Sequence, residues 1–300
     1  MTSPAAITFA LPYYSNLGYL REAIDSVLAQ TISNWKMIVV DDAGPESAAD
    51  LVHQLDDHRI SYIRNSVNLG LAGNWNECLR HATTSYVTLL HTDDRLSPRY
   101  AEAVLAAAEA HPEAAAVFTD AAIIGADGLP ARSLPDFVKR FARRPRADHE
   151  VVGDTGLAGV LTNNYIFCPA LTYRTSSIGS TPFDPRWSMV LDLDLIARLL
   201  AGGQILRCVR QPLYEYRRHQ SNQTALLTAD ARRFTEEIAL YRELAAIAAT
   251  QKWTRSERAA QWHVMIRIHL VVQIVNDAIR GRRQAASSKW AMLKADLRRE

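Results

Sequence analysis

The sequence has 300 residues, of which 48% are hydrophobic and 22% are charged. This composition is typical of a globular protein with one large core or two smaller ones, and it excludes a disordered chain. The formal net charge of +2 gives no reason to expect a nucleic-acid partner. The three cysteines are odd in number and far apart, so they predict no disulfide framework, no paired metal ligands and a reducing, cytoplasmic location. We expect no signal peptide and no membrane span, because every apolar run is short.

The first hundred residues alternate between two kinds of segment. Short, largely apolar runs at 7–11, 37–40, 60–63 and 86–90 are separated by segments whose apolar residues recur with helical spacing. Strands that are apolar throughout indicate a parallel sheet covered by helices on both faces. In such α/β sheets, ligands bind beyond the carboxyl ends of the strands, where the order of connections reverses.

Two pairs of acidic residues follow these strands. Asp41 and Asp42 end the second strand, and the fourth strand runs into His91, Asp93 and Asp94 in "YVTLLHTDDR". Adjacent carboxylates repel each other, and a hard cation such as Mg²⁺ or Mn²⁺, shared with substrate phosphates, would relieve that repulsion. For the first pair, a turn or helix-capping role is an equally good interpretation. It is a weaker one for the second pair, because Ser97-Pro98 is expected to cap and begin the next helix.

The rest of the chain is less regular. We expect a helix from Ser97 to about 110, strands at 117–119, 170–174 and 205–209, a helix at 192–200, and helices from 228 to the end. The basic, proline-containing stretch 131–149 predicts a loop or mobile flap. The predicted domains are therefore 1–225, with halves 1–100 and 101–225, and a helical C-terminal extension, 226–300.

Some phosphate-binding classes lack their motifs here. The sequence contains no G-x-x-x-x-G-K-[ST] loop and no G-x-G-x-x-G after the first strand, which argues against a P-loop NTPase and a dinucleotide dehydrogenase. A glycine-rich, basic loop after the first strand is also missing, which disfavours a nucleotidyltransferase.

The order of motifs resembles one family. "ALPYYSNLGYLREAIDSVLAQTISNWKMIVVDDAGPE" and "NLGLAGNWNECLRHATTSYVTLLHTDDRLSP" are similar to the family-2 glycosyltransferases of the GT-A fold. The resemblance covers residues 5–100 closely and extends more loosely to about 225. It implies a Rossmann-like, mostly parallel sheet and an inverting enzyme that uses a nucleotide-diphosphate sugar with Mg²⁺ or Mn²⁺. It makes 1–100 the half that binds the nucleotide sugar and 101–225 the acceptor and catalytic half.

The resemblance also assigns site residues. The nucleotide-sugar ligands would be Pro12, Tyr14, Asp42, Asn68, Asn76, His91, Asp93, Arg217 and Arg218, and the metal ligands Asp93, Asp94 and His219. His91 departs from the family pattern, because it stands where the family usually has aspartate. A neutral imidazole can bind a metal or a ribose, but it brings no charge, so we expect weaker metal binding.

The catalytic base is assigned from "FDPRWSMVLDLDLIARLLAGG". Its resemblance to the family's F-D-x…E-D-x-x-L pattern makes Asp192 the base that takes the proton of the acceptor hydroxyl. Leu191 stands where the family has glutamate, which leaves two alternatives open. Asp194 is a competing base, and Asp192 could instead cap its helix.

The expected acceptor is a glycan or a lipid-linked saccharide in surface polysaccharide or lipopolysaccharide biosynthesis. A catalytically inactive nucleotide-sugar-binding or scaffold protein of the same fold is the alternative. The C-terminal helices carry many basic residues, among them Arg267, Arg280 and Lys294. They could lie peripherally on the inner face of an anionic membrane, or form the solvated face of a helical cap or homodimer arm.

Overall fold

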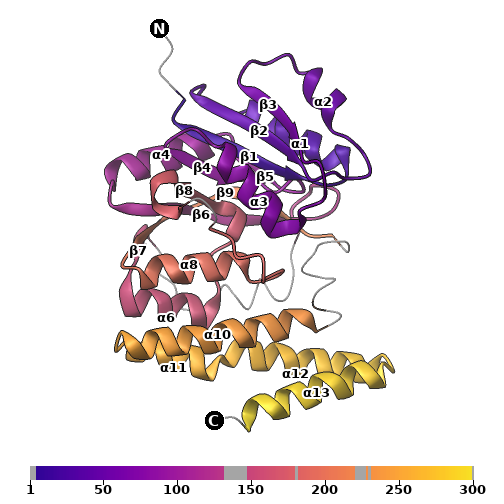
Figure 1. Ribbon diagram of the computed structural model, residues 1–300, viewed down its shortest axis with the longest axis vertical. Helices are drawn as coiled ribbons and strands as arrows, with labels where there is room; N and C mark the ends of the chain where they lie inside the picture. The colour runs from indigo at the N-terminus through magenta and orange to yellow at the C-terminus, as the bar shows by residue number, and fades with distance from the viewer. Residues whose placement is uncertain (1–4, 132–146, 180–181, 220–227, 229–230, 299–300) are drawn as a thin grey trace. The chain divides into compact units, whose positions relative to one another are not determined.

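The computed structural model describes residues 5–131, 147–179, 182–219, 228 and 231–298 (Figure 1). The chain forms two compact units. The first contains Met1–Gly153 and Tyr165–His219, and the second contains Asp154–Asn164 and Gln220–Glu300. Most of the basic stretch predicted as a loop or flap, residues 132–146, lies outside the described residues.

The first unit is built on one sheet. Its strands are β1 (Ile7–Tyr13), β2 (Trp35–Asp41), β3 (Ile60–Arg64), β4 (Tyr86–Leu89), β5 (Arg95–Leu96), β6 (Ala114–Ile124), β7 (His149–Val151), β8 (Leu171–Arg174) and β9 (Ile205–Arg217). Their order is β3-β2-β1-β4-β8-β6-β9-β5, with β7 paired to β9. Only β5, β7 and β8 among the described strands run antiparallel to their neighbours. The prediction of a mostly parallel α/β sheet is confirmed.

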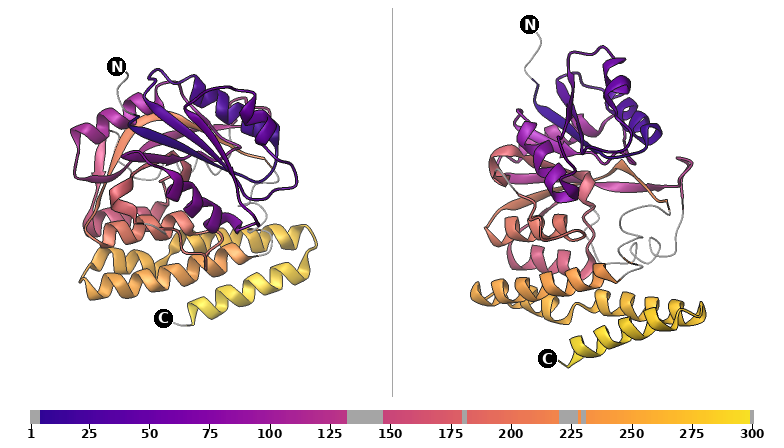
Figure 2. Two further views of the ribbon diagram at one scale, coloured as in Figure 1. Left: turned by 45° about the horizontal axis from the view of Figure 1, so that its top comes forward. Right: turned by 45° about the vertical axis from the view of Figure 1, so that its right-hand side comes forward.

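Helices cover both faces of this sheet (Figure 2). They are α1 (Leu17–Leu28), α2 (Ala49–His53), α3 (Gly70–His81), α4 (Tyr100–Ala110), α7 (Thr175–Ile178) and α8 (Leu191–Ala201), with a 3₁₀ turn at Cys168–Ala170. Alternate residues of β1, such as Phe9 and Leu11, share a core with Ile24 of α1 and Val104 of α4. Helix α3 contacts β1, β2 and β4. Burial on both faces explains why β1 is apolar along its length.

The connections reverse direction beside β1. Strands β2 and β3 extend the sheet on one side of β1, whereas β4 returns to pair with its other side. The carboxyl ends of β1 and β4 therefore form the switch point at which α/β sheets bind ligands.

Three local expectations were incorrect or incomplete. Helix α4 begins at Tyr100, and Ser97 does not cap it through its side chain. Instead, Ser97 donates its N–H to Leu213 O (2.8 Å) and accepts from the side chain of Gln30 (2.9 Å), which holds 97–99 in a turn. Strands β6 and β9 are longer than predicted, and the short strands β5 and β7 were missed because they are too brief to show a period.

The second unit is helical, as predicted. Its helices are α6 (Gly153–Asn163), α10 (Arg232–Thr250), α11 (Thr254–Trp262), α12 (Val264–Ile279) and α13 (Arg283–Leu297). The sequence placed 154–164 in the first domain, but this segment groups with the C-terminal helices. The Asp154 carboxylate accepts the first N–H groups of α11, from Arg255 and Ser256, and Tyr241 donates to Leu161 O (2.7 Å). These are long-range contacts, which local sequence patterns do not report.

Candidate functional site

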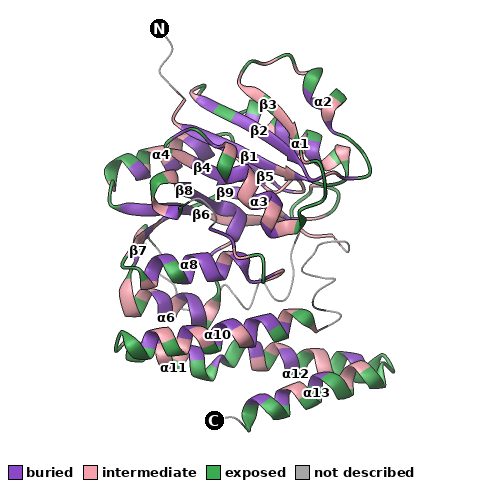
Figure 3. Ribbon diagram, viewed as in Figure 1, coloured by how far each residue is buried: buried purple, intermediate pink, exposed green. Residues whose placement is uncertain are grey.

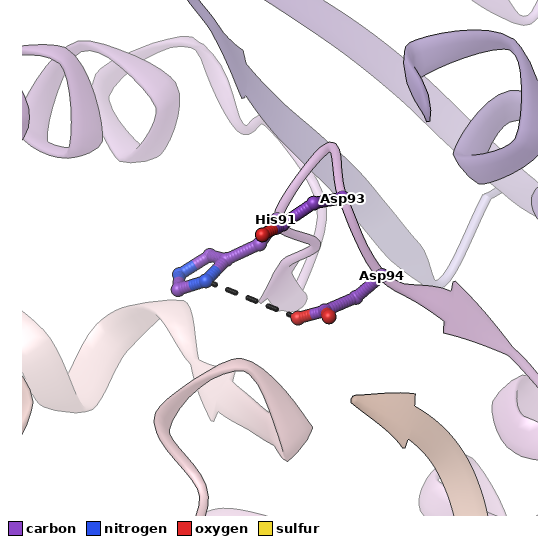
Figure 4. Close-up of side chains that lie close together, drawn as sticks. All are labelled: His91, Asp93 and Asp94. Atoms are coloured by element: carbon purple, nitrogen blue, oxygen red, sulfur yellow. Dashed lines mark ion pairs between the residues drawn. The ribbon is translucent and has the colours of Figure 1, made fainter. Parts of the chain in front are cut away.

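The turn after β4 brings together three side chains that can bind a cation. The Asp94 N–H donates to His91 O (3.1 Å), which closes a tight turn before β5. Ligand atoms of His91, Asp93 and Asp94 all lie within 4.8 Å of one another. Figure 4 shows the three side chains leaving this turn, with His91 Nδ1 4.0 Å from Asp94 Oδ2. Ligands on opposite sides of a small divalent cation are about 4 Å apart, so this spacing fits one ion.

Asp94 is the innermost of the three, with 1% of its surface exposed. Its Oδ2 accepts from the Tyr214 hydroxyl and its Oδ1 from the Arg217 N–H, both at 2.7 Å. Burial, and then the neighbouring Asp93 charge, raise the pKa of Asp94 well above its usual range. A carboxylate oxygen can accept more than one bond, so the Asp94 oxygens can still bind a cation. A positive charge at this turn would offset the cost of burying Asp94 beside a second acid.

Arg217 already places one positive charge next to this turn, on its buried side. Its guanidinium is fully buried, donates to Asp93 O (2.7 Å) and Ala126 O (3.1 Å), and forms an ion pair with Glu22. The guanidinium carbon also lies 4.6 Å from the centre of the Tyr19 ring. These contacts fix the turn from inside the unit. The sequence predicted direct contact between Arg217 and the donor, whereas the structure shows a side chain that holds the main chain of Asp93.

The two residues after β9 differ in their surroundings. His219 Nε2 lies 3.0 Å from Asp93 Oδ2, and its ring is 5.3 Å from that of Tyr19. Arg218 is half-buried, and its N–H donates to Ile124 O (2.9 Å). The predicted metal ligands Asp93, Asp94 and His219 therefore lie around one turn, although His219 is 126 positions after Asp93 in the sequence.

His91 is suited to act as a neutral ligand. Burial lowers the pKa of its imidazole, which keeps the ring uncharged near neutral pH. Its Nε2 is buried and makes no hydrogen bond within the described part of the chain. The ring lies 5.0 Å from that of Trp75, which in turn meets Phe183 edge-on at 5.0 Å. This aromatic group fixes the imidazole with Nδ1 on the side of Asp94, so Nδ1 is the nitrogen that could bind a cation at the turn.

The acids after β2 act as local anchors. Asp41 accepts from the Tyr62 hydroxyl (2.6 Å), the Gly44 N–H (3.1 Å) and Arg64. Asp42 accepts the N–H groups of Leu69 and Gly70 at the start of α3 (2.8 and 3.0 Å) and the amide of Asn65 (2.9 Å). The turn and capping interpretation describes these contacts. A role of Asp42 toward a nucleotide remains a prediction.

The loop after β2 lies against the end of β1. A Cβ on Gly44 would lie 1.7 Å from Tyr14 O, so only glycine fits there. Tyr14 itself is 50% exposed beyond β1, and Pro12 is half-buried. Asn68 is also exposed and accepts from the Gly70 N–H (2.8 Å). The predicted nucleotide residues of these loops thus end on one edge of the sheet, at the carboxyl ends of β1, β2 and β3.

The side chain of Asn76 hydrogen-bonds to the protein main chain. Its amide donates to Phe183 O (2.8 Å) and accepts from the Phe183 N–H (3.0 Å). This two-point contact links α3 to the segment before α8 and positions Phe183 against Trp75. Asn76 therefore supports the surroundings of His91, which the sequence could not show.

The two candidate bases on α8 are separated by their environment. Asp194 is buried and bonded to Arg198 (2.7 Å), whereas Asp192 is half-buried in the first turn of the helix. Burial raises the pKa of the Cys168 thiol well above its usual range, and the charges of Asp192 and Asp94 raise it further. The carboxylates of Asp192 and Asp94 therefore both lie close enough to Cys168 to raise its pKa. Asp194 is committed to a structural pair, which favours Asp192.

Similarity to known proteins places the chain in a family. The family described as "Glycosyl transferase family 2" matches residues 8–161, about half of the chain. The chain belongs to this family. It is 34% identical to "Glycosyltransferase GlyA" of Streptococcus pneumoniae over 98 residues, which cover 32% of this chain and 14% of that protein. It is 31% identical to "UDP-Glc:alpha-D-GlcNAc-diphosphoundecaprenol beta-1,3-glucosyltransferase WfgD" of Escherichia coli over 88 residues, which cover 29% and 35%. The matches span half or less of these and other curated relatives.

Solved structures share the fold. The S. aureus TarS 1–349 complex with UDP-GlcNAc aligns with a TM-score of 0.65 and 12% identity over 98% of this chain and 92% of that one. The mannosyltransferase PcManGT of Pyrobaculum calidifontis, in complex with GDP-Man and Mn²⁺, aligns with a TM-score of 0.56 and 14% identity over 99% and 81%. At these identities the likeness concerns the fold, and the predicted GT-A fold is confirmed.

Proposed function

We propose that this protein is a metal-dependent, inverting glycosyltransferase that uses a nucleotide-diphosphate sugar. The observation that carries the proposal is the meeting of His91, Asp93 and Asp94 at the switch point of the sheet, with His219 on Asp93. A neutral nitrogen, two carboxylates and a second imidazole suit Mn²⁺ or Mg²⁺. Such an ion, when bound, would stabilise the negative charge of the leaving diphosphate.

The donor would bind across the carboxyl ends of β1, β2 and β4. Tyr14 and Pro12 offer apolar surface to the base, and Asp42 and Asn68 offer polar groups beside it. Arg218 and His219 follow β9 and bring donors of hydrogen bonds to the diphosphate side of the turn. Arg217 supports them indirectly, since its buried charge holds the Asp93 main chain.

Asp192 would act as the base. In an inverting transfer, a carboxylate on the face of the sugar away from the diphosphate takes the acceptor hydroxyl's proton as the new carbon–oxygen bond forms. Asp192 is half-buried in the first turn of α8, whereas Asp194 is buried and forms an ion pair with Arg198.

The acceptor we propose is a glycan or lipid-linked saccharide of a bacterial surface polysaccharide. The name of WfgD gives a saccharide on diphosphoundecaprenol as the acceptor of that relative. A lipid-linked acceptor would require the protein to work at the inner face of a membrane.

The test is a donor panel. UDP-glucose, UDP-GlcNAc and GDP-mannose are each incubated with the protein, Mn²⁺ or Mg²⁺ and simple glycoside acceptors, and release of nucleoside diphosphate is measured. We expect turnover with one donor class, its loss on adding EDTA, and a drop of about 10³-fold or more in Asp192→Asn. Asp194→Asn should retain turnover if it stays folded.

Other outcomes decide between the alternatives. Donor binding by calorimetry without turnover in any form would favour the inactive binding or scaffold protein. Turnover kept in Asp192→Asn and lost in a folded Asp194→Asn would move the base to Asp194. Nuclear magnetic resonance of the product reports whether the anomeric configuration is inverted.

A further inference from the structure

The outer face of α12 is apolar along its whole length. Opposite the buried residues Ile266, Leu270 and Asp277, the helix exposes Val264, Met265, Ile268, Val271, Val272, Val275 and Ile279, each between 44% and 79% exposed. At about 100° per residue these side chains form one stripe centred on Ile268. Figure 3 shows exposed surface along α12 and α13, in contrast to the buried strands of the sheet. The solvent side of a helix in a globular protein is normally polar, so this face indicates a binding surface.

The inner face of α12 is fixed by buried polar contacts. The Lys289 ammonium lies 2.6 Å from a carboxylate oxygen of Asp277. The Asp296 carboxylate pairs with the side-chain nitrogens of His263 (2.7 Å) and Arg267 (3.0 Å). Each of these pairs joins α12, or the residue that precedes it, to α13. Turning the apolar face inward would leave these buried charges unpaired, which is strongly unfavourable. The exposed stripe is therefore the native orientation of the helix.

The charges around the apolar face have one sign. Within 264–298 the only acidic residues are Asp277 and Asp296, and both are buried in ion pairs. The exposed charged side chains are basic: Arg280, Arg282, Arg283, Lys294 and Arg298. Trp290 on α13 is 47% exposed, with the Lys294 ammonium 5.2 Å from its ring centre. Exposed tryptophan and basic residues beside an apolar stripe are characteristic of helices that lie in a membrane interface.

We propose that the outer face of α12, with the basic residues of the α12–α13 hairpin, binds the surface of an anionic lipid bilayer. The helix would lie in the plane of the interface over its length of about 24 Å, with the apolar stripe below the headgroups. Among the described helices, none is both long and apolar enough to cross a bilayer. A second copy of the chain is a poorer occupant, because it would bring two sets of exposed cations together. This inference rests on the surface alone and does not depend on the proposed function.

The experiment measures binding of the full chain to vesicles by co-sedimentation. Vesicles of phosphatidylcholine alone are compared with vesicles of phosphatidylcholine and phosphatidylglycerol. We expect binding to the anionic vesicles only, weakened by added salt, and reduced by about tenfold or more in the double variant Ile268→Glu/Val272→Glu. Leu129→Glu is the matched control, since it places one like charge at a 64% exposed apolar position of the first unit. It should bind as the wild type does.

Three results would overturn the proposal. The first is absence of binding to the anionic vesicles by the wild-type protein. The second is unchanged binding in the double variant with circular dichroism like that of the wild type. The third is a wild-type dimer in light scattering that the double variant turns into a monomer, with no vesicle binding, which would assign the face to a second copy. Should the double variant unfold, Arg280→Glu/Arg283→Glu replaces it and must weaken binding to anionic vesicles.

Discussion

The Nε2 atom of His219 lies 3.0 Å from Oδ2 of Asp93, a residue 126 positions earlier in the chain. The contact joins the turn after β4 to the segment that follows β9. Both groups can bind a divalent cation, so we propose His219 as a further ligand beside His91, Asp93 and Asp94 of the turn.

Replacing His219 by alanine tests this pairing. The apparent affinity for Mn²⁺ and the value of kcat/KM should each fall by about 10- to 100-fold, because Asp93 loses a partner that orients it. Nucleoside-diphosphate release at increasing Mn²⁺ concentrations measures both quantities. His58→Ala removes an imidazole with a 94% exposed side chain and serves as the control. Equal Mn²⁺ dependence in both variants would contradict the assignment.

Replacing Arg217 by methionine should destabilise the fold. The fully buried guanidinium bonds to Asp93 O and Ala126 O, and these carbonyls and Glu22 lose their donor. Glu22 is 41% exposed, so solvent screens its charge and we expect a loss of about 2–3 kcal/mol in the free energy of unfolding. Urea unfolding measures this loss. Arg21→Met, in an exposed pair, should cost less than about 0.5 kcal/mol; comparable losses in the two variants would show that the Arg217 network is not needed.

Asn76→Ala should disturb the metal site from a distance. The substitution removes both hydrogen bonds to the Phe183 main chain and costs about 1–2 kcal/mol of stability. Because Phe183 packs on Trp75 and Trp75 on His91, we also expect weaker Mn²⁺ binding, measured by calorimetry. Gln273→Ala, an amide in the other unit, is the control. Unchanged metal affinity in a measurably destabilised Asn76→Ala would show that the aromatic group does not position His91.

Asp57 provides a pH test of stability. Hydrogen bonds from Arg59 lower the pKa of Asp57 from 3.8 to about 2. Since the folded-state pKa lies below the unfolded one, the stabilisation is present above about pH 4 and disappears as the pH falls through 2. Asp57→Asn should therefore be less stable than the wild type by on the order of 2 kcal/mol at pH 7, and the difference should vanish near pH 2. Urea unfolding across this range measures it, and a difference that persists at pH 2 would refute the assignment.

Local patterns predicted the first half of the sheet well, since β1, β2 and β4 are largely buried and apolar, and periodic helices separate the strands. They also led to the turn containing Asp93 and Asp94, because two acids after a buried strand are chemically unusual. The hydrogen bonds that Asp94 accepts from Tyr214 and from the Arg217 main chain were not predicted. Tyr214 belongs to the second half of β9, which continues past the apolar run 205–209 with polar residues, so its strand character came from pairing with β6 and β5.

The structural role of Arg217 also depends on contacts between distant parts of the chain. A charged residue next to a family-like motif is expected at the surface, and only the three-dimensional contacts with Glu22 and Ala126 reveal its burial. The exposure of Met265 and Val271 on α12 could not be predicted from the sequence either. Periodicity gives the faces of a helix, but it does not say which face meets the rest of the protein.

Asp94 obtains its two hydrogen bonds from Tyr214 and Arg217, 120 and 123 residues further along the chain. During synthesis, a nascent polypeptide that ends before β9 lacks these two donors. Until β9 is made, Asp94 must therefore hydrogen-bond to water, and the turn cannot become buried. We therefore expect chains truncated ahead of residue 214 to expose this turn to proteases, even when β1 to β4 have already paired.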